Sequence, residues 1–214
     1  MSANDTPGIR EHAETSQRWL TQNHMEETMV DIQELVKDCN FGLTKVSDIV
    51  TELRKFARMD DDNLTEIDIN DCIDSTIKLV SNELKYHCDL HIELGDTRPV
   101  LANEGKINQV LTNLLVNAGH AIEDKGTIQV HSGTAKHKEI GDSTWFSVRD
   151  DGCGISPQNL DRIFEPFYTS KDIGKGTGLG LAISYSIIEK LGGKITVESE
   201  LNKFTCFTVF LKQK

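Results

Sequence analysis

Hydrophobic residues in the first quarter of the chain recur at alternating intervals of three and four. The positions that carry this repeat are Met29, Ile32, Val36, Cys39, Leu43, Val46, Val50, Leu53 and Ala57. Such spacing forms the a/d seam of a heptad repeat, and no proline interrupts it. The pattern predicts a helix over residues 26–58, preceded by a polar and weakly patterned segment, residues 1–25.

The seam can be interpreted in two ways. A helix of this length is too long to be one packing element of a compact domain, and its narrow stripe needs another helix. This favours a helical hairpin or bundle made with a second copy of the chain. The alternative is an amphipathic helix that folds onto its own domain. Because the run MDDDNLT at 59–65 breaks the repeat and predicts a linker, we expect a helical region, 1–60, and a second domain, 61–214.

Beyond the linker, helical and strand patterns follow one another. The sequence predicts helices over 70–86, 103–123 and 179–191, the last of them stopped by two glycines. Alternating apolar and polar residues predict strands over 89–94, 127–132, 144–150, 194–199 and 205–212. This order predicts an α+β sandwich, in which helices cover one face of a mixed sheet.

Composition narrows the class of protein. The 214 residues carry a formal net charge of −11, with 37% hydrophobic and 27% charged residues, as in a soluble globular protein. Nucleic acid and anionic membranes require a basic face, so neither is an expected partner. No apolar run approaches the roughly 18 residues that span a bilayer. We therefore expect a cytoplasmic protein, attached to a membrane only through segments outside this chain. The scattered cysteines fit a reducing compartment.

A row of amides crosses the helix predicted at 103–123. Gln109, Asn113 and Asn117 are spaced four residues apart, so their side chains are neighbours. They could form a solvated surface or a hydrogen bond to another helix. They could instead line a polar site, because an asparagine oxygen is a suitable ligand for Mg²⁺.

Four glycines precede the helix predicted at 179–191. In the stretch GKGTGLGLAIS they occupy alternate positions, Gly174, Gly176, Gly178 and Gly180. Each glycine costs about 0.5–1 kcal/mol relative to alanine in an ordinary element, so a close approach of the backbone is expected, most often to phosphate. The spacing matches neither the dinucleotide-binding pattern nor the P-loop. Two flanking lysines are either exposed to solvent or in contact with phosphate, Lys171 and Lys175.

Two further segments carry candidate chemistry. In VRDDGCGIS, Asp150 ends a predicted strand, and Gly152 and Gly154 follow it. An aspartate in this position is often only a turn former. It could also accept a hydrogen bond from an adenine amino group, with the glycines allowing the base to approach. The other segment is IFEPFYTSK at 163–171, which could be a hydrophobic turn.

In order and spacing, the four segments resemble the N, G1, F and G2 boxes of bacterial sensor histidine kinases. These are NQVLTNLLVNAGHA, DDGCGI, IFEPFYTSK and GKGTGLGLAIS. The resemblance runs from about residue 45 to the end, and VSDIVTELRKFAR looks like the end of the second helix of the dimerisation and histidine-phosphotransfer domain. It implies the Bergerat ATP-binding fold shared with gyrase-type ATPases, ATP and Mg²⁺ as cofactors, a homodimer formed through a helical bundle, and a response-regulator receiver domain as partner.

The resemblance also implies roles for individual residues. The Mg²⁺ ligand falls on Asn117, and the adenine-binding aspartate falls on Asp150. The ATP lid, which would meet the phosphates, falls on Gly174, Gly176, Thr177, Gly178, Leu179 and Gly180, with Lys171 and Lys175 as further phosphate contacts and Phe164 and Phe167 tying the lid to the helical region. Asn113 stands where relatives that hydrolyse ATP carry a glutamate. Since an amide is no general base, hydrolysis should be slow, and the phosphoryl group would pass to a histidine.

The sequence departs from the family pattern at several positions. Asp151 replaces the usual asparagine of the G1 box, and Phe204 rather than glycine precedes Thr205. Neither His12 nor His24 has the sequence context of a phosphoacceptor. We therefore expect that the acceptor lies outside this chain, and that residues 1–25 are the tail of the first bundle helix and its turn. The predicted function is the ATP-binding core of a sensor histidine kinase. The alternatives are a slow ATPase of the same fold and a nucleotide-binding dimerisation module.

Overall fold

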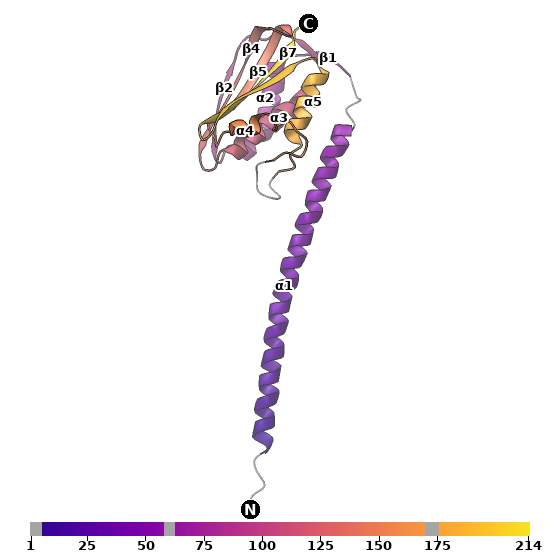
Figure 1. Ribbon diagram of the computed structural model, residues 1–214, viewed down its shortest axis with the longest axis vertical. Coiled ribbons are helices and arrows are strands. Elements are labelled where there is room, and N and C mark those ends of the chain that lie inside the picture. Colours follow the sequence, from indigo (N-terminus) through magenta and orange to yellow (C-terminus); the bar gives the residue numbers. More distant parts are fainter. Residues whose placement is uncertain (1–5, 58–62, 170–175) are drawn as a thin grey trace, which may run out of the picture. The chain divides into compact units, whose positions relative to one another are not determined.

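The computed structural model describes residues 6–57, 63–169 and 176–214 (Figure 1). The chain divides into two compact units, Met1–Thr51 and Glu52–Lys214. The first is helical, and the second contains a sheet with its covering helices.

Helix α1 runs without interruption from Thr6 to Ala57, a length of 52 residues. The predicted helix is therefore confirmed, but its predicted start at residue 26 and the turn expected within residues 1–25 are wrong. Pro7 lies in the first turn, where its missing N–H removes no hydrogen bond. From Gly8 to Ala57 there is no proline and only one further glycine, Gly42. The polar segment contains no residue that would stop a helix, so the helix extends through it.

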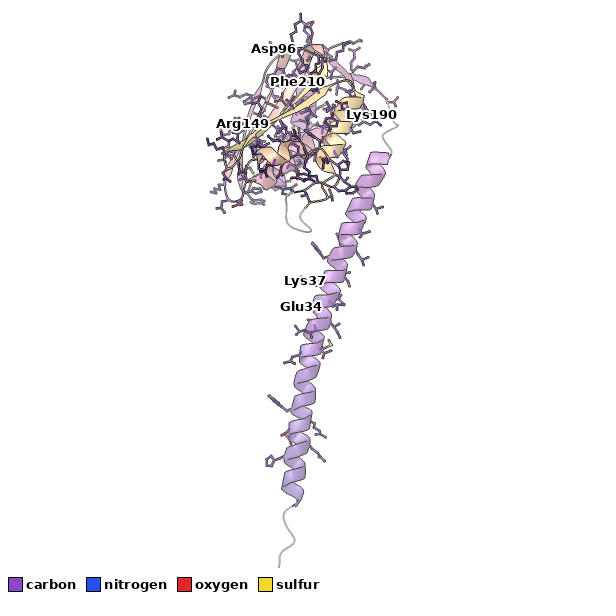
Figure 2. All side chains as sticks on the ribbon, viewed as in Figure 1. Glu34, Lys37, Asp96, Arg149, Lys190 and Phe210 are labelled. Atoms are coloured by element: carbon purple, nitrogen blue, oxygen red, sulfur yellow. The ribbon has the colours of Figure 1, made fainter. Side chains whose placement is uncertain are left out.

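The described side chains of the heptad seam are exposed. Their exposed fractions range from 49% at Val50 to 69% at Leu43. Cys39, which occupies a seam position, is exposed as well. Figure 2 shows Glu34 and Lys37 projecting from α1, so charged and apolar side chains alike face outward. The side chains of Leu53 and Ala57 lie outside the described part of the helix.

The second unit is built on a mixed sheet of five strands in the order β2-β4-β5-β7-β6. Strand β2 pairs in parallel with β4, and the remaining pairs are antiparallel. The bounds are β2 Cys88–Leu94, β4 Gly126–His137, β5 Gly141–Asp150, β6 Lys194–Glu200 and β7 Phe204–Lys212. All five predicted strands are confirmed, β4 being several residues longer than predicted. Two short strands, β1 (Thr65–Ile67) and β3 (Val100–Ala102), form a separate antiparallel pair that the sequence did not predict.

Three helices lie against this sheet, each close to its predicted range. They are α2 (Ile69–Leu84), α3 (Glu104–Ala121) and α5 (Gly180–Lys190) (Figure 1). Asp68 and Asn103 cap α2 and α3, because their side chains accept backbone N–H groups of the first turn. A fourth helix, α4 (Pro157–Leu160), is a single turn that was not predicted.

Helix α3 lies at the centre of this layer, where it packs against α2, α5 and the sheet. Its apolar face is buried in the core, with Ile107, Val110, Leu111, Leu114 and Leu115 no more than 1% exposed. Burying this face fixes the rotation of the helix about its axis. The row of amides at the edge of that face therefore projects from α3 in a defined direction.

Candidate functional site

Asn113 on α3 connects this helix to the start of α5. Its Nδ2 donates to the Gly180 carbonyl at 3.0 Å and to the Ser184 hydroxyl at 3.2 Å. The Ser184 hydroxyl in turn donates to the Gly180 carbonyl at 2.9 Å. Of the interpretations given for the row of amides, the structure shows a hydrogen bond to another helix at Asn113. Its role in catalysis stays a prediction.

Asn117 lies one turn further along α3 and is half-buried. Among the residues that the structure describes, its side chain has no hydrogen-bond partner. A half-buried amide without a partner loses hydration that nothing in the protein replaces, which suits a residue that binds a ligand. Its side-chain oxygen is a ligand of the type that Mg²⁺ accepts.

Asp150 is the last residue of β5 and is only 3% exposed. Its carboxylate accepts the backbone N–H of Gly152 at 3.0 Å. Burial, together with the nearby charge of Asp151, raises the pKa of this carboxyl to about 6, although hydrogen bonds from the backbone of Gly152 and Thr205 act in the opposite direction. A buried carboxylate with a raised pKa at the end of a strand is a candidate ligand-binding group.

Asp151, the departure from the family pattern, has a local structural role. Its Oδ1 accepts the backbone N–H of Thr127 at 2.7 Å, and its own N–H donates to the Thr127 carbonyl at 3.3 Å. These bonds join the end of β5 to the start of β4. The aspartate therefore serves here as a backbone acceptor.

Both glycines after Asp150 are explained by close contacts within the protein. A Cβ at Gly152 would collide with the carbonyl of Ala121 at the end of α3, and a Cβ at Gly154 with the carbonyl of Glu200. The loop between them is held from both sides, because the Cys153 N–H donates to Ala121 at 2.9 Å and the Asn202 N–H donates to Cys153 at 2.7 Å. The approach of a base to these glycines stays a prediction.

Gly178 passes equally close to another segment of the chain. Its φ is +68°, and a Cβ there would lie 2.5 Å from the carbonyl carbon of Phe167. Phe167 is exposed, whereas Phe164 is half-buried and its ring lies 5.2 Å from that of Tyr185. The F-box segment thus packs against the segment that leads into α5.

The first turn of α5 has no side-chain cap, because the residue before it is the buried Leu179. The orphan N–H groups of such a turn, with the helix dipole, favour an anion. Thr177 accepts the Leu179 N–H at 3.4 Å, and Gly176 and Thr177 are half-buried. Three predicted site residues lie outside the described residues: Lys171, Gly174 and Lys175.

Two serines belong to this region and were not predicted from the sequence. Ser184 completes the Asn113 contact, and its spacing of four residues from Gly180 on a helix was the available signal. Ser199 accepts the Ile155 N–H at 2.7 Å and lies 3.1 Å from the hydroxyl of Thr205, which pairs with Asp150 across the sheet. Nothing in the sequence around Ser199 indicated this contact.

Comparison with known proteins identifies the family of this chain. Residues 102–214 match the family described as histidine kinase-, DNA gyrase B-, and HSP90-like ATPase. The sensor kinase CckA of Brucella abortus is 33% identical over 205 residues, covering 90% of this chain and 21% of CckA. The catalytic domain of the histidine kinase ThkA superposes with a TM-score of 0.61 at 32% identity, covering 71% of this chain and 96% of that domain. ThkA in complex with the response regulator TrrA superposes with a TM-score of 0.66 at 27% identity, covering 81% of this chain and 48% of the ThkA chain.

The chain therefore belongs to the histidine kinase-, gyrase- and HSP90-like ATPase family, and its second unit has the fold of a histidine kinase catalytic domain. This confirms the predicted Bergerat fold and the predicted use of ATP. The chain spans about a fifth of the length of CckA.

Proposed function

We propose that this chain is the ATP-binding kinase core of a two-component sensor histidine kinase. It binds ATP with Mg²⁺ and delivers the γ-phosphoryl group to a histidine, from which the group passes to an aspartate of a response regulator. The observation that carries the proposal is that one helix, α3, connects the buried carboxylate of Asp150 to the uncapped start of α5.

Helix α3 sets the spacing of these groups. Asn113 contacts Gly180 at the start of α5, and Ala121 contacts the loop after Asp150. Asn117 lies midway between them, since residues four apart on a helix are separated by about 6 Å along its axis and share a face. An elongated ligand with a base at one end and phosphates at the other fits this order of groups.

Each group then has a separate task. The Asp150 carboxylate accepts from the adenine amino group. Asn117 would hold Mg²⁺, and the ion would supply positive charge that neutralises the phosphates. The N–H groups of the first turn of α5 bind the phosphate oxygens. Catalysis by these residues rests on positioning and electrostatic stabilisation.

The ATPase alternative is less well supported by the site. An amide cannot take a proton from water, and the nitrogen of the Asn113 amide already donates to two groups of α5. This residue is therefore committed to holding α5. A γ-phosphoryl group held here would await a histidine that can approach it.

Two partners complete the proposal. The exposed seam of α1 fits a helical bundle with a second copy of the chain. The ThkA complex supports a receiver domain as the second partner, because TrrA is a response regulator bound to a histidine kinase of the same fold.

Among the residues that the structure describes, no helix is long and apolar enough to cross a bilayer.

The decisive experiment mixes this chain with labelled ATP, Mg²⁺ and a partner subunit that carries the acceptor histidine but cannot bind ATP. We expect acid-labile label on the partner and slow release of phosphate in its absence. Rapid release of phosphate without transfer would support an ATPase instead. ATP binding without transfer would support a nucleotide-binding dimerisation module.

A further inference from the structure

We infer that Ser184 is a positioning residue for phosphoryl transfer, acting through the side-chain amide of Asn113. The inference deepens the proposed function and rests on it. It starts from a closed triangle of hydrogen bonds among Asn113, Ser184 and the Gly180 carbonyl, with lengths from 2.9 to 3.2 Å.

The triangle determines which end of the Asn113 amide faces α5. A carbonyl oxygen can only accept, so the amide nitrogen must face Gly180. The single hydroxyl proton of Ser184 is committed to the same carbonyl, at 2.9 Å. The Ser184 oxygen is then left as an acceptor, and it accepts from the same amide nitrogen of Asn113 at 3.2 Å. Because the nitrogen is held by these two acceptors, the amide oxygen takes no part in the triangle.

The triangle lies where the orientation of the Asn113 amide affects the proposed site. Asn113 is half-buried, and among the described residues its oxygen has no hydrogen-bond partner. Asn117, whose amide also has no such partner, is the next residue on the same row of α3. The triangle therefore presents an acceptor beside the proposed metal ligand, and it does so from a fixed rotamer.

The same bonds also fix the first turn of α5. Ser184 is fully buried and is the polar member of the buried face of this helix. A serine that bonded only its own helix would add nothing to the contact between α5 and α3. The bond from Asn113 crosses between the helices, so the N–H groups of the first turn are held in register with the amide row.

The test is the substitution Ser184→Ala. It removes one of the two acceptors of the Asn113 amide nitrogen but leaves the bond to Gly180 in place. Losing one neutral hydrogen bond predicts a transfer kcat lowered about 3- to 10-fold, with the affinity for adenosine changed less than about twofold. The side-chain amide resonance of Asn113 in a ¹⁵N–¹H spectrum, recorded without nucleotide, should also shift. Ser184→Thr retains a hydroxyl that can bond the same carbonyl. This variant should restore most of the transfer kcat and most of the wild-type position of the Asn113 resonance.

Ser75→Ala is the matched control. The Ser75 hydroxyl donates to the Cys72 carbonyl of its own helix, α2, at 3.0 Å, and among the described residues it forms no hydrogen bond with α3. We expect no change in kcat or in the Asn113 resonance. An unshifted resonance with unchanged kcat in Ser184→Ala would overturn the inference. So would an equal loss of adenosine affinity, which would indicate general loosening of the fold. If the wild-type chain itself failed to transfer phosphate, the proposed function would fall, whereas the resonance would still test the triangle.

Discussion

The backbone N–H of Phe167 donates to the carbonyl of Gly178 at 3.0 Å, and both residues have a φ of +68°. The F-box segment and the segment before α5 therefore meet backbone to backbone, each in the left-handed region. For phenylalanine this conformation is strained, which indicates that the surrounding contacts hold it in place. Gly178 is required at this contact, whatever ligand its neighbours bind.

The first prediction compares two glycines of the same run. Gly178→Ala should destabilise the domain by more than about 1–2 kcal/mol, since a Cβ is unfavourable at positive φ and would also meet Phe167. Gly180→Ala should be neutral or stabilise α5 by up to about 1 kcal/mol, because the nearest atom would be 3.6 Å away and its φ is ordinary. Thermal unfolding of both variants measures the difference. Equal loss of stability in both would contradict the contact described for Gly178.

A second prediction concerns Asp150→Asn. The pKa of Asp150 is raised from 3.8 to about 6, so between these values the folded state binds the extra proton. Stability from this group is therefore greatest below pH 4 and falls as the pH rises through about 6. The neutral asparagine avoids this cost, so at pH 8 the variant should be at least as stable as the wild type. The free energies of unfolding of the variant and the wild type, measured by chemical denaturation, should become equal near pH 4.

The same substitution should weaken nucleotide binding. Loss of a charged hydrogen bond costs on the order of 1.5–3 kcal/mol, so calorimetry at pH 8 should show at least a tenfold weaker affinity for ADP. Wild-type affinity should also fall as the pH drops below about 6, whereas that of the variant should not share this dependence. Unchanged affinity in the variant would remove the proposed adenine contact.

Asp151→Asn provides a third prediction. The Asp151 charge contributes to the raised pKa of Asp150, and an asparagine keeps an oxygen that can accept the Thr127 N–H. We expect the midpoint of the pH-dependent nucleotide affinity to move to lower pH, with little change in thermal stability. A midpoint that stays in place would show that burial alone raises the pKa.

A fourth prediction separates metal use from nucleotide binding. Asn117→Ala should abolish measurable phosphoryl transfer, while the affinity for ATP measured with a chelator present changes less than about threefold. The reason is that the amide is proposed to act through Mg²⁺ and forms no bond with the described residues. Gln109→Ala, on the same amide row, is the control and should retain transfer. Retained transfer in the Asn117 variant would remove it from the mechanism.

The fifth prediction concerns association. The exposed seam of α1 should drive formation of a homodimer, so light scattering should give twice the mass of one chain. Replacing Leu43 and Val46 with lysine should yield monomers whose second unit still binds ATP. A wild-type chain that remained monomeric at high concentration would contradict the bundle.

Sequence patterns predicted the sheet and its three main helices because each of these elements has a strong periodicity. The short strands β1 and β3 and the single turn α4 contain three or four residues, too few to show a period. The start of α1 was mislocated because a polar segment can be helical without an apolar stripe. Ile73, Val80 and Leu84 of α2 are buried on one face of the helix, as its amphipathic spacing requires.

The site was predictable in part, for a different reason. Order and spacing identified the segments that carry Asn113, Asn117 and Asp150. They did not show that the glycines after Asp150 contact Ala121 and Glu200, since these residues are distant in sequence. The contact between Asn113 and Ser184 could not be predicted from local patterns either, because Ser184 lies 71 positions further along the chain. Such contacts depend on how the helices pack, which local patterns do not encode.

The loop after Asp150, held between the end of α3 and the turn that joins β6 to β7, has a kinetic consequence. Its conformation is fixed by protein contacts alone, through Cys153 and Asn202. Binding at this end therefore requires little loss of conformational entropy on association, and encounter with adenosine should proceed without a slow rearrangement. Stopped-flow binding of adenosine should accordingly show a single phase whose rate rises linearly with concentration.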